Sequence, residues 1–215
     1  MTSEKRVSYT AGNTYTTLNE FSSTTKTVWL VFHGMGHLSR YFIRHFAGLN
    51  PKENFIIAPQ APSKYYQGPE NKHVGASWLT REDTVEETKS VLAYVDAVWN
   101  AEKSMDVPRL VVFGYSQGVS IACRWLASRQ VQCDHLLMQS GGIPKELTSE
   151  SFKYMNKSTR IQFSYGTEDP YITQSRVLEE KARGIELFGE DLTVAAFKGA
   201  HEVYVPFIER LVVNF

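Results

Sequence analysis

Short apolar runs alternate along this chain with longer stretches in which apolar residues recur every three or four positions. The run at 28–32 is apolar on both faces, which is typical of a parallel strand covered by helices, and the spaced stretches are typical of amphipathic helices. The predicted strands are residues 28–32, 55–58, 110–113, 135–139, 160–165 and 192–197, and the predicted helices are residues 39–46, 83–99, 119–126, 173–187 and 206–213. Because predicted strands and helices alternate along the chain, the sequence predicts an α/β fold, with a mostly parallel central sheet and helices on both of its faces.

Two segments fall outside this alternation. Residues 7–18 predict a hairpin, because two polar, β-prone stretches flank a turn signal at Gly12-Asn13. The stretch from Ser63 to Ser77 is polar and aromatic without periodicity, so it is predicted to be a long loop, and long loops in compact domains are often functional.

The segment from Gly141 to Ser158 is too short for a cap domain, which predicts an open site without a large lid.

Length and charge narrow the class of protein. A chain of 215 residues can bury one core, so residues 1–215 are predicted to form a single domain. Lys plus Arg and Asp plus Glu both number 23, so no overall field attracts nucleic acid or an acidic membrane. No window is long and apolar enough for an integral membrane segment, and the N-terminal stretch lacks the apolar core of a secretory signal. Nothing in the pattern predicts an oligomeric state.

The two cysteines, Cys123 and Cys133, fit no metal-binding pattern. Two thiols in a chain of this length do not require a disulfide, and we expect free, mostly buried thiols in a reducing compartment. This expectation places the protein in the cytoplasm.

The predicted strand at 110–113 leads into Gly114-Tyr115-Ser116-Gln117-Gly118, a G-x-S-x-G sequence followed by an amphipathic stretch. In that context the pattern predicts a nucleophile elbow, a sharp strand-to-helix turn that holds Ser116 in a strained conformation with its hydroxyl above the sheet edge. Gly114 and Gly118 supply the space that this turn needs. The alternative is an ordinary turn with a buried serine.

A serine hydroxyl needs a base to take its proton and an acid to orient that base. Among the six histidines, His201 combines a place after a late strand with the order serine, acid, histidine that α/β-hydrolases show, although it could also be a surface residue near a helix start. Glu168 and Asp169 are adjacent candidates for the acid, and Pro170 favours Asp169 because it holds the turn. These residues follow the carboxyl ends of predicted strands, so they can meet at one edge of the sheet.

Stabilising the oxyanion of such a reaction takes two backbone N–H donors. The predicted donors are the amides of Gln117, directly after the nucleophile, and of Met35, in the 33–36 loop that follows an early strand. His33 and His37 stand four apart, as two metal ligands on a helix would, but the glycines between them disfavour a helix and the sequence offers no third ligand nearby. We therefore expect a site that uses no metal and no cofactor.

Together these motifs resemble the carboxylesterase/phospholipase family, which includes the acyl-protein thioesterases and consists of small α/β-hydrolases without a large lid. The resemblance covers most of the chain beyond the predicted hairpin. The segments that carry it are Leu30–Gly36, Ala58–Pro62, Ser77–Leu79, Gly114–Gly118, Ser140–Pro144, Gly166–Pro170 and Gly199–Glu202. It implies the α/β-hydrolase fold, hydrolysis of carboxylic esters and Asp169 as the acid. His37 stands where the family usually has an acidic residue, and Leu79-Thr80 stand where it usually has Phe-Asp, so the substrate is expected to differ.

Three functions are compatible with this site. In the leading one, Ser116 attacks the carbonyl of a small-molecule ester, His201 shuttles the proton, Asp169 orients His201, and water frees the acyl-enzyme. An acyl-thioesterase or lysophospholipase is the second, and a non-catalytic ligand-binding protein on a hydrolase fold is the third. Aromatic residues are candidates for lining the substrate pocket, although each could equally pack in the core or on the surface: Trp78, Tyr65, Tyr66 and Tyr171.

Overall fold

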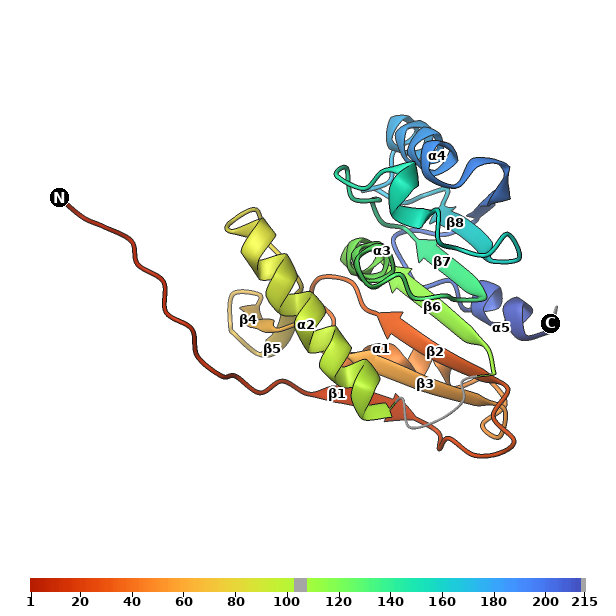
Figure 1. Ribbon diagram of the computed structural model, residues 1–215, viewed down its shortest axis with the longest axis horizontal. Helices are drawn as coiled ribbons and strands as arrows, with labels where there is room; N and C mark the ends of the chain where they lie inside the picture. The colour runs from red at the N-terminus through yellow and green to blue at the C-terminus, as the bar shows by residue number, and fades with distance from the viewer. Residues whose placement is uncertain (103–107, 214–215) are drawn as a thin grey trace.

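A computed structural model describes residues 1–102 and 108–213 of the chain. At its centre lies a seven-stranded sheet with the strand order β1-β3-β2-β6-β7-β8-β9 (Figure 1). Every neighbouring pair is parallel except β1 with β3, which is antiparallel. The strands of this sheet are β1 (Tyr15–Leu18), β2 (Thr27–Phe32), β3 (Asn54–Pro59), β6 (Leu110–Tyr115), β7 (His135–Gln139), β8 (Arg160–Gly166) and β9 (Leu192–Phe197). The prediction of a mostly parallel sheet is therefore confirmed, and an antiparallel strand closes one edge.

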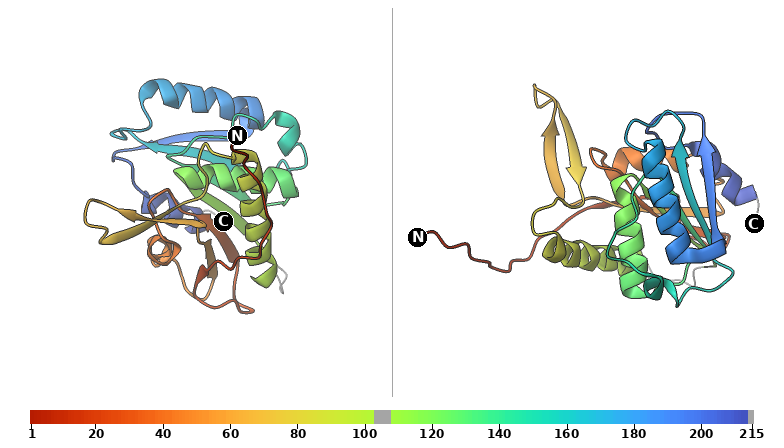
Figure 2. Two further views of the ribbon diagram at one scale, coloured as in Figure 1. Left: turned by 90° about the vertical axis from the view of Figure 1, so that its left-hand side faces the viewer. Right: turned by 90° about the horizontal axis from the view of Figure 1, so that it is seen from above.

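Helices cover both faces of this sheet (Figures 1 and 2). Side chains of β2 alternate between the two faces: Leu30 and Phe32 pack with residues of α2, α3 and α4, whereas Trp29 and Val31 pack with residues of α1, η1 and α5. Because both faces are covered, every residue of β2 is buried, which explains its uninterrupted apolar run. The helices are α1 (Ser39–Phe42), η1 (Ile43–Phe46), α2 (Thr84–Glu102), α3 (Gln117–Arg129), η2 (Ser149–Phe152), α4 (Gln174–Phe188), η3 (Gly189–Asp191) and α5 (Val205–Val213), where η marks 3₁₀ turns.

The predicted N-terminal hairpin is wrong. Only β1 forms a strand, and it pairs with β3 rather than with residues 8–10, which run as an exposed tail (Figure 1). The polar residues of the tail bring no apolar face that could be buried against the sheet. No turn forms at Gly12-Asn13, and the Asn13 side chain donates to the backbone oxygen of Gln60 at 2.6 Å, which ties the chain to the end of β3.

The predicted long loop between Ser63 and Ser77 is also wrong, because it forms the two-stranded antiparallel hairpin β4 (Ser63–Gln67) and β5 (His73–Ser77). Figure 2 shows this hairpin standing out from the body of the molecule. Four of the five β4 residues are exposed, so the strand carries none of the apolar alternation by which strands are recognised in a sequence.

Among the described residues, no cap domain interrupts the fold. Between β7 and β8 the chain adds only the short 3₁₀ turn η2, which agrees with the prediction of no large lid. Cys123 and Cys133 are both free and buried, which confirms the expectation for them. Among the described residues, no helix combines the length and apolar character that crossing a membrane requires.

Candidate active site

The turn between β6 and α3 has the shape of the predicted elbow. Ser116 has a φ of 52° and a ψ of −121°, a combination that L residues rarely adopt and that costs about 1–3 kcal/mol. A side chain at Gly114 would come within 2.6 Å of Val119 Cα, and one at Gly118 within 2.1 Å of the backbone oxygen of Phe32. The Ser116 N–H donates to the Gln139 oxygen at 2.8 Å, which ties the turn to the end of β7.

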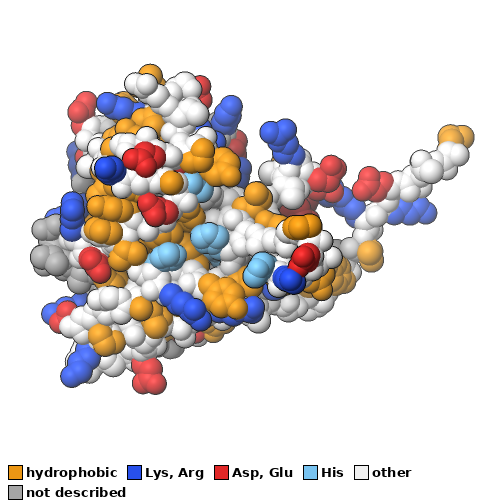
Figure 3. Space-filling view, turned by 180° about the vertical axis from the view of Figure 1, so that it is seen from behind, with side chains coloured by type: hydrophobic (Ala, Val, Ile, Leu, Met, Phe, Trp, Pro, Cys, Tyr) orange, Lys and Arg blue, Asp and Glu red, His pale blue; other side chains and the backbone are white. Residues whose placement is uncertain are grey.

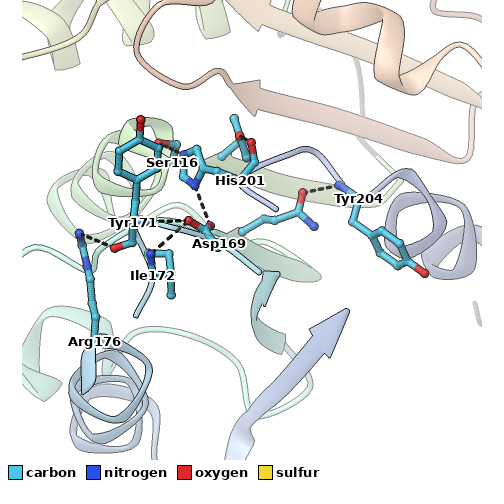
Figure 4. Close-up of polar contacts among 9 residues, drawn as sticks. Ser116, Asp169, Tyr171, Ile172, Arg176, His201 and Tyr204 are labelled. Atoms are coloured by element: carbon cyan, nitrogen blue, oxygen red, sulfur yellow. Dashed lines mark hydrogen bonds and ion pairs between the residues drawn. The ribbon is translucent and has the colours of Figure 1, made fainter. Parts of the chain in front are cut away.

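The three residues predicted to act together lie in one hydrogen-bonded line (Figure 4). His201 Nε2 lies 2.9 Å from Ser116 Oγ, and His201 Nδ1 lies 2.7 Å from Asp169 Oδ2. A neutral imidazole with its proton on Nδ1 donates to Asp169 and accepts from Ser116, which is the arrangement that a general base requires. The residues come from the loops after β6, β8 and β9, whose carboxyl ends share one edge of the sheet.

The carboxylate of Asp169 is held from its other side. Its Oδ1 accepts the backbone N–H groups of Tyr171 at 2.8 Å and Ile172 at 3.1 Å, and its side chain has no exposed surface. These donors hold the carboxylate so that its other oxygen faces His201. Glu168, the adjacent candidate, is exposed, and its own N–H bonds the backbone oxygen of Gly199. Asp169 is thus the carboxylate that contacts His201.

The two predicted oxyanion donors lie on a common cavity of about 500 Å³ with Ser116 and His201. Gln117 is the first residue of α3, so its N–H has no acceptor within the helix. Met35 lies in the turn after β2, where Gly36 N–H bonds Ala76 oxygen at 2.8 Å and His37 N–H bonds Gly34 oxygen at 3.2 Å. Within residues 1–102 and 108–213, the Met35 N–H donates no hydrogen bond.

The four aromatic candidates for the substrate pocket are placed differently from one another. Tyr171 lines the cavity, and its ring meets the His201 imidazole edge-on with 4.9 Å between centroids. Tyr65 and Tyr66 are exposed on β4, outside the residues that line this cavity. The prediction for Trp78 is wrong, because its side chain has no exposed surface and its indole N–H donates to the backbone oxygen of His33 at 2.8 Å.

Sequence reasoning missed how the elbow glutamine is used. The Gln117 side-chain oxygen accepts the Trp78 N–H at 2.8 Å, and its nitrogen donates to the Leu79 oxygen at 2.6 Å. The side chain thereby clamps the segment after β5 against the elbow while the backbone of Gln117 faces the cavity. The signals were present as two motifs, the elbow and the Ser77–Leu79 segment, but nothing in a linear sequence connects them.

His33 is a structural residue rather than a metal ligand. Its Nδ1 lies 2.8 Å from the Gly34 oxygen and its Nε2 accepts the Ala61 N–H at 3.1 Å, so both ring nitrogens are occupied. Burial lowers the pKa of His33 from 6.5 to about 4, which keeps the ring neutral at physiological pH. Across the part of the chain that the structure describes, no three His, Cys, Asp or Glu side chains gather as a metal site would need.

Comparisons with known proteins agree with this architecture. The sequence profile of the Phospholipase/Carboxylesterase family matches residues 13–212. Among solved structures, an acyl-protein thioesterase 2 from Zea mays is 14% identical with a TM-score of 0.68, covering 94% of this chain and 97% of that one. Esterase PE8 is 18% identical with a TM-score of 0.70 and coverages of 95% and 99%. A phospholipase/carboxylesterase from Dyadobacter fermentans is 22% identical with a TM-score of 0.66 and coverages of 96% and 97%.

At these identities the solved structures support the fold alone, which is that of the α/β-hydrolases. No curated protein sequence matches the chain. The family profile covers nearly the whole described chain, from β1 to α5. The chain therefore belongs to the phospholipase/carboxylesterase family of ester-hydrolysing enzymes.

Proposed function

We propose that the chain hydrolyses carboxylic esters through an acyl-enzyme on Ser116. The observation that carries the proposal is the line from Ser116 Oγ through His201 to Asp169, with separations of 2.9 Å and 2.7 Å. In this mechanism His201 Nε2 takes the hydroxyl proton as Ser116 Oγ attacks the carbonyl carbon. The buried Asp169 carboxylate stabilises the imidazolium that forms.

Negative charge then develops on the former carbonyl oxygen, and the N–H groups of Met35 and Gln117 are proposed to stabilise it together with the N-terminus of α3. As the tetrahedral intermediate collapses, His201 gives its proton to the leaving alcohol. Water enters, loses a proton to His201 and attacks the acyl carbon, and the carboxylic acid leaves with Ser116 restored.

The lining of the cavity favours short or polar acyl groups over long alkyl chains. Ser120, Ser140 and Arg176 line it together with Tyr171 and Ile172, so it offers no continuous apolar channel. This argues for a carboxylesterase rather than for a lysophospholipase. Thioesters remain the second candidate substrate, because the same nucleophile attacks both kinds of carbonyl.

Labelling with a fluorophosphonate, combined with turnover of ester and thioester panels of graded acyl length, tests the proposal. We expect a single label that disappears in Ser116→Ala and persists in Ser120→Ala, whose hydroxyl lies one turn along α3 and bonds the Gln117 oxygen at 2.9 Å. We expect Ser116→Ala to lower kcat by about six orders of magnitude and Asp169→Asn by about four. Labelled protein that turns over no ester or thioester would indicate a ligand-binding protein instead.

We also infer that the protein works in the cytoplasm. The support is that both thiols are free and buried, as in proteins kept in a reducing compartment. Trapping thiols with an alkylating agent during cell lysis should recover both cysteines in reduced form, and recovery of a disulfide would contradict the inference.

A further inference from the structure

We call the 33–36 loop, which carries Met35, the oxyanion loop. A second cavity lies on the far side of this loop from Ser116. It has a volume of about 460 Å³ and is enclosed by that loop, by α1 with η1, and by the β4–β5 hairpin. We call it the cationic cavity, because its polar walls consist mainly of basic side chains. The polar side chains that line it include His37, Arg40, His45, Gln67, Lys72 and His73. Figure 3 shows this face, where histidine side chains gather near the middle with Lys and Arg side chains beside them.

The positive charge of the cationic cavity is poorly balanced. Among the described residues that line it, none is acidic. Arg40 lies over the Tyr41 ring, 4.9 Å from its centroid, and pairs with no carboxylate in the described ranges. Lys72 pairs with Glu70 at the tip of the hairpin, but both side chains are mostly exposed, so the pair is weak and can exchange for a ligand.

The two histidines deeper in the wall are also short of negative charge. Burial lowers the pKa of His37 and of His45, and the positive charges of His45 and His201 lower that of His37 further. Both causes oppose protonation, and a bound anion would offset them. The wall therefore combines permanent cations at its rim with imidazole groups that can donate hydrogen bonds inside it.

The cationic cavity begins close to the nucleophile. A Cβ at Gly34 would lie 3.1 Å from Ser116 Cβ, and Gly36, two residues later, already lines the cationic cavity. Two residues span at most about 7 Å, so Gly36 lies within about 12 Å of Ser116 Cβ, and a carbonyl attacked by Ser116 lies within about 15 Å of the cationic cavity. The His37 ring lies 5.5 Å from that of Tyr115, which in turn lies 5.3 Å from that of His201. The two cavities are therefore neighbours, with the Tyr115 ring between their histidines.

The wall is also fixed to the loop that carries Met35. Gly36 accepts a hydrogen bond from the Gln67 side chain at 3.2 Å and donates one to the Ala76 oxygen at 2.8 Å. The hairpin and the loop thus form one hydrogen-bonded unit that holds the two walls of the cavity together. Sites with walls fixed in this way lose little affinity to ordering.

We propose that the cationic cavity binds an anionic group, a carboxylate or a phosphate, carried by the ester that Ser116 hydrolyses. The role in substrate selection rests on the proposed esterase function, whereas anion binding by the cavity does not. Arg40 and Lys72 supply the charge, and His37 and His45 supply further donors. The substrate class is an ester with a second, acidic group within about 15 Å of its carbonyl.

Matched pairs of neutral and anionic esters test the substrate role. On the acyl side, p-nitrophenyl pentanoate is compared with the p-nitrophenyl monoester of glutaric acid. On the alcohol side, phenyl acetate is compared with its 4-carboxy and 4-phosphate derivatives. Together the acyl-side and alcohol-side comparisons identify which part of the ester carries the anion and which anion is preferred. We expect kcat/KM to favour the anionic member of at least one pair by about tenfold, and the ratio to fall with rising salt.

The double variant Arg40→Gln, Lys72→Gln should lower that anionic-to-neutral ratio about tenfold. Lys64→Gln is the matched control, because Lys64 is an exposed lysine on β4 that lies outside the cationic cavity, and the ratio should not change in it. Ratios near one in every pair, or an equal fall for both members in the double variant, would overturn the substrate role.

Binding of inorganic phosphate and of glutarate to the Ser116→Ala protein, followed by calorimetry and by histidine NMR signals, tests the cavity without turnover. Saturable binding that the double variant loses, with an unchanged melting temperature, supports the site even if no ester is hydrolysed. Hydrolysis of neutral esters without anion preference, together with no phosphate or glutarate binding, would overturn this inference and leave the proposed esterase function standing.

Discussion

His33 makes the stability of this protein sensitive to acid in a way that can be calculated. The ring is completely buried beneath the oxyanion loop, where it donates to Gly34 and accepts from Ala61. Protonation of Nε2 would remove the acceptor for the Ala61 N–H and place a charge among apolar neighbours such as Phe42 and Trp78. The folded state therefore resists a proton that the unfolded chain accepts.

The direction and size of this stability change follow from the pKa of His33 in the folded state and in the unfolded state. Burial lowers the pKa of His33 in the folded state from its ordinary 6.5 to about 4. As the pH falls below 6.5, the unfolded state takes up the proton first, so stability is lost between pH 6.5 and 4 and is fully present above that range. At pH 5 the loss is about 2 kcal/mol. His135, at the start of β7, also has a pKa lowered to about 4 by burial and contributes a similar loss.

Urea denaturation at pH 7.5 and pH 5 measures this effect. Between these two pH values, His33→Gln should lose about 2 kcal/mol less stability than the wild type, because the other buried histidines titrate in both proteins. The free-energy gap between the two proteins should thus narrow by about 2 kcal/mol on acidification. Val112→Ala, an equally buried change without a titrating group, serves as the control and should keep the same deficit at both pH values. A gap for His33→Gln that is as constant as that of the control would refute the reasoning.

Two further predictions concern the core. Gly118→Ala should destabilise the fold by more than about 3 kcal/mol because the added carbon would lie 2.1 Å from the Phe32 oxygen, whereas Gly12→Ala, with nothing within 4 Å, should stay within about 0.5 kcal/mol of wild type. Thermal unfolding compares the two, and equal effects would contradict the packing argument. Burial raises the pKa of Cys123 and Cys133 to about 12, so Ellman's reagent should find almost no thiol in the native protein and two per chain in urea. Fast native reaction of either thiol would show that the burial is incomplete in solution.

The inner strands of the central sheet, such as β2, β6 and β7, could be predicted because their sequences reflect burial on two faces. The strand at 135–139 has the predicted bounds, and so does the edge strand at 192–197. The five residues expected on the buried side of α2 are the buried ones. The order of motifs, together with the rule that ligands bind at the carboxyl ends of strands, also predicted that Ser116, Asp169 and His201 would meet.

What sequence reasoning missed depends on contacts between distant segments. The clamp of Gln117 on Trp78 joins residues 39 positions apart. An indole that could equally line a pocket or pack in the core has no local pattern that distinguishes the two, so Trp78 was misplaced. At the N-terminus, the turn expected at Gly12-Asn13 does not form, and β1 pairs with β3 instead of with residues 8–10. Local propensity for a turn was overridden by pairing with a strand far along the chain.

The position of the β4–β5 hairpin depends on contacts between distant segments rather than on its own sequence. An isolated two-stranded hairpin is marginally stable in water, and most of this one is exposed, so its own residues do not fix where it stands. Its position depends on the bonds of Gly36 to Gln67 and Ala76, and on Gly75, where a Cβ would lie 2.7 Å from the Gly36 oxygen. The same Gly36 follows the proposed oxyanion donor Met35. A change that loosens the hairpin would therefore displace both the wall of the cationic cavity and the proposed donor, so under these two proposals substrate preference and rate are coupled through one glycine.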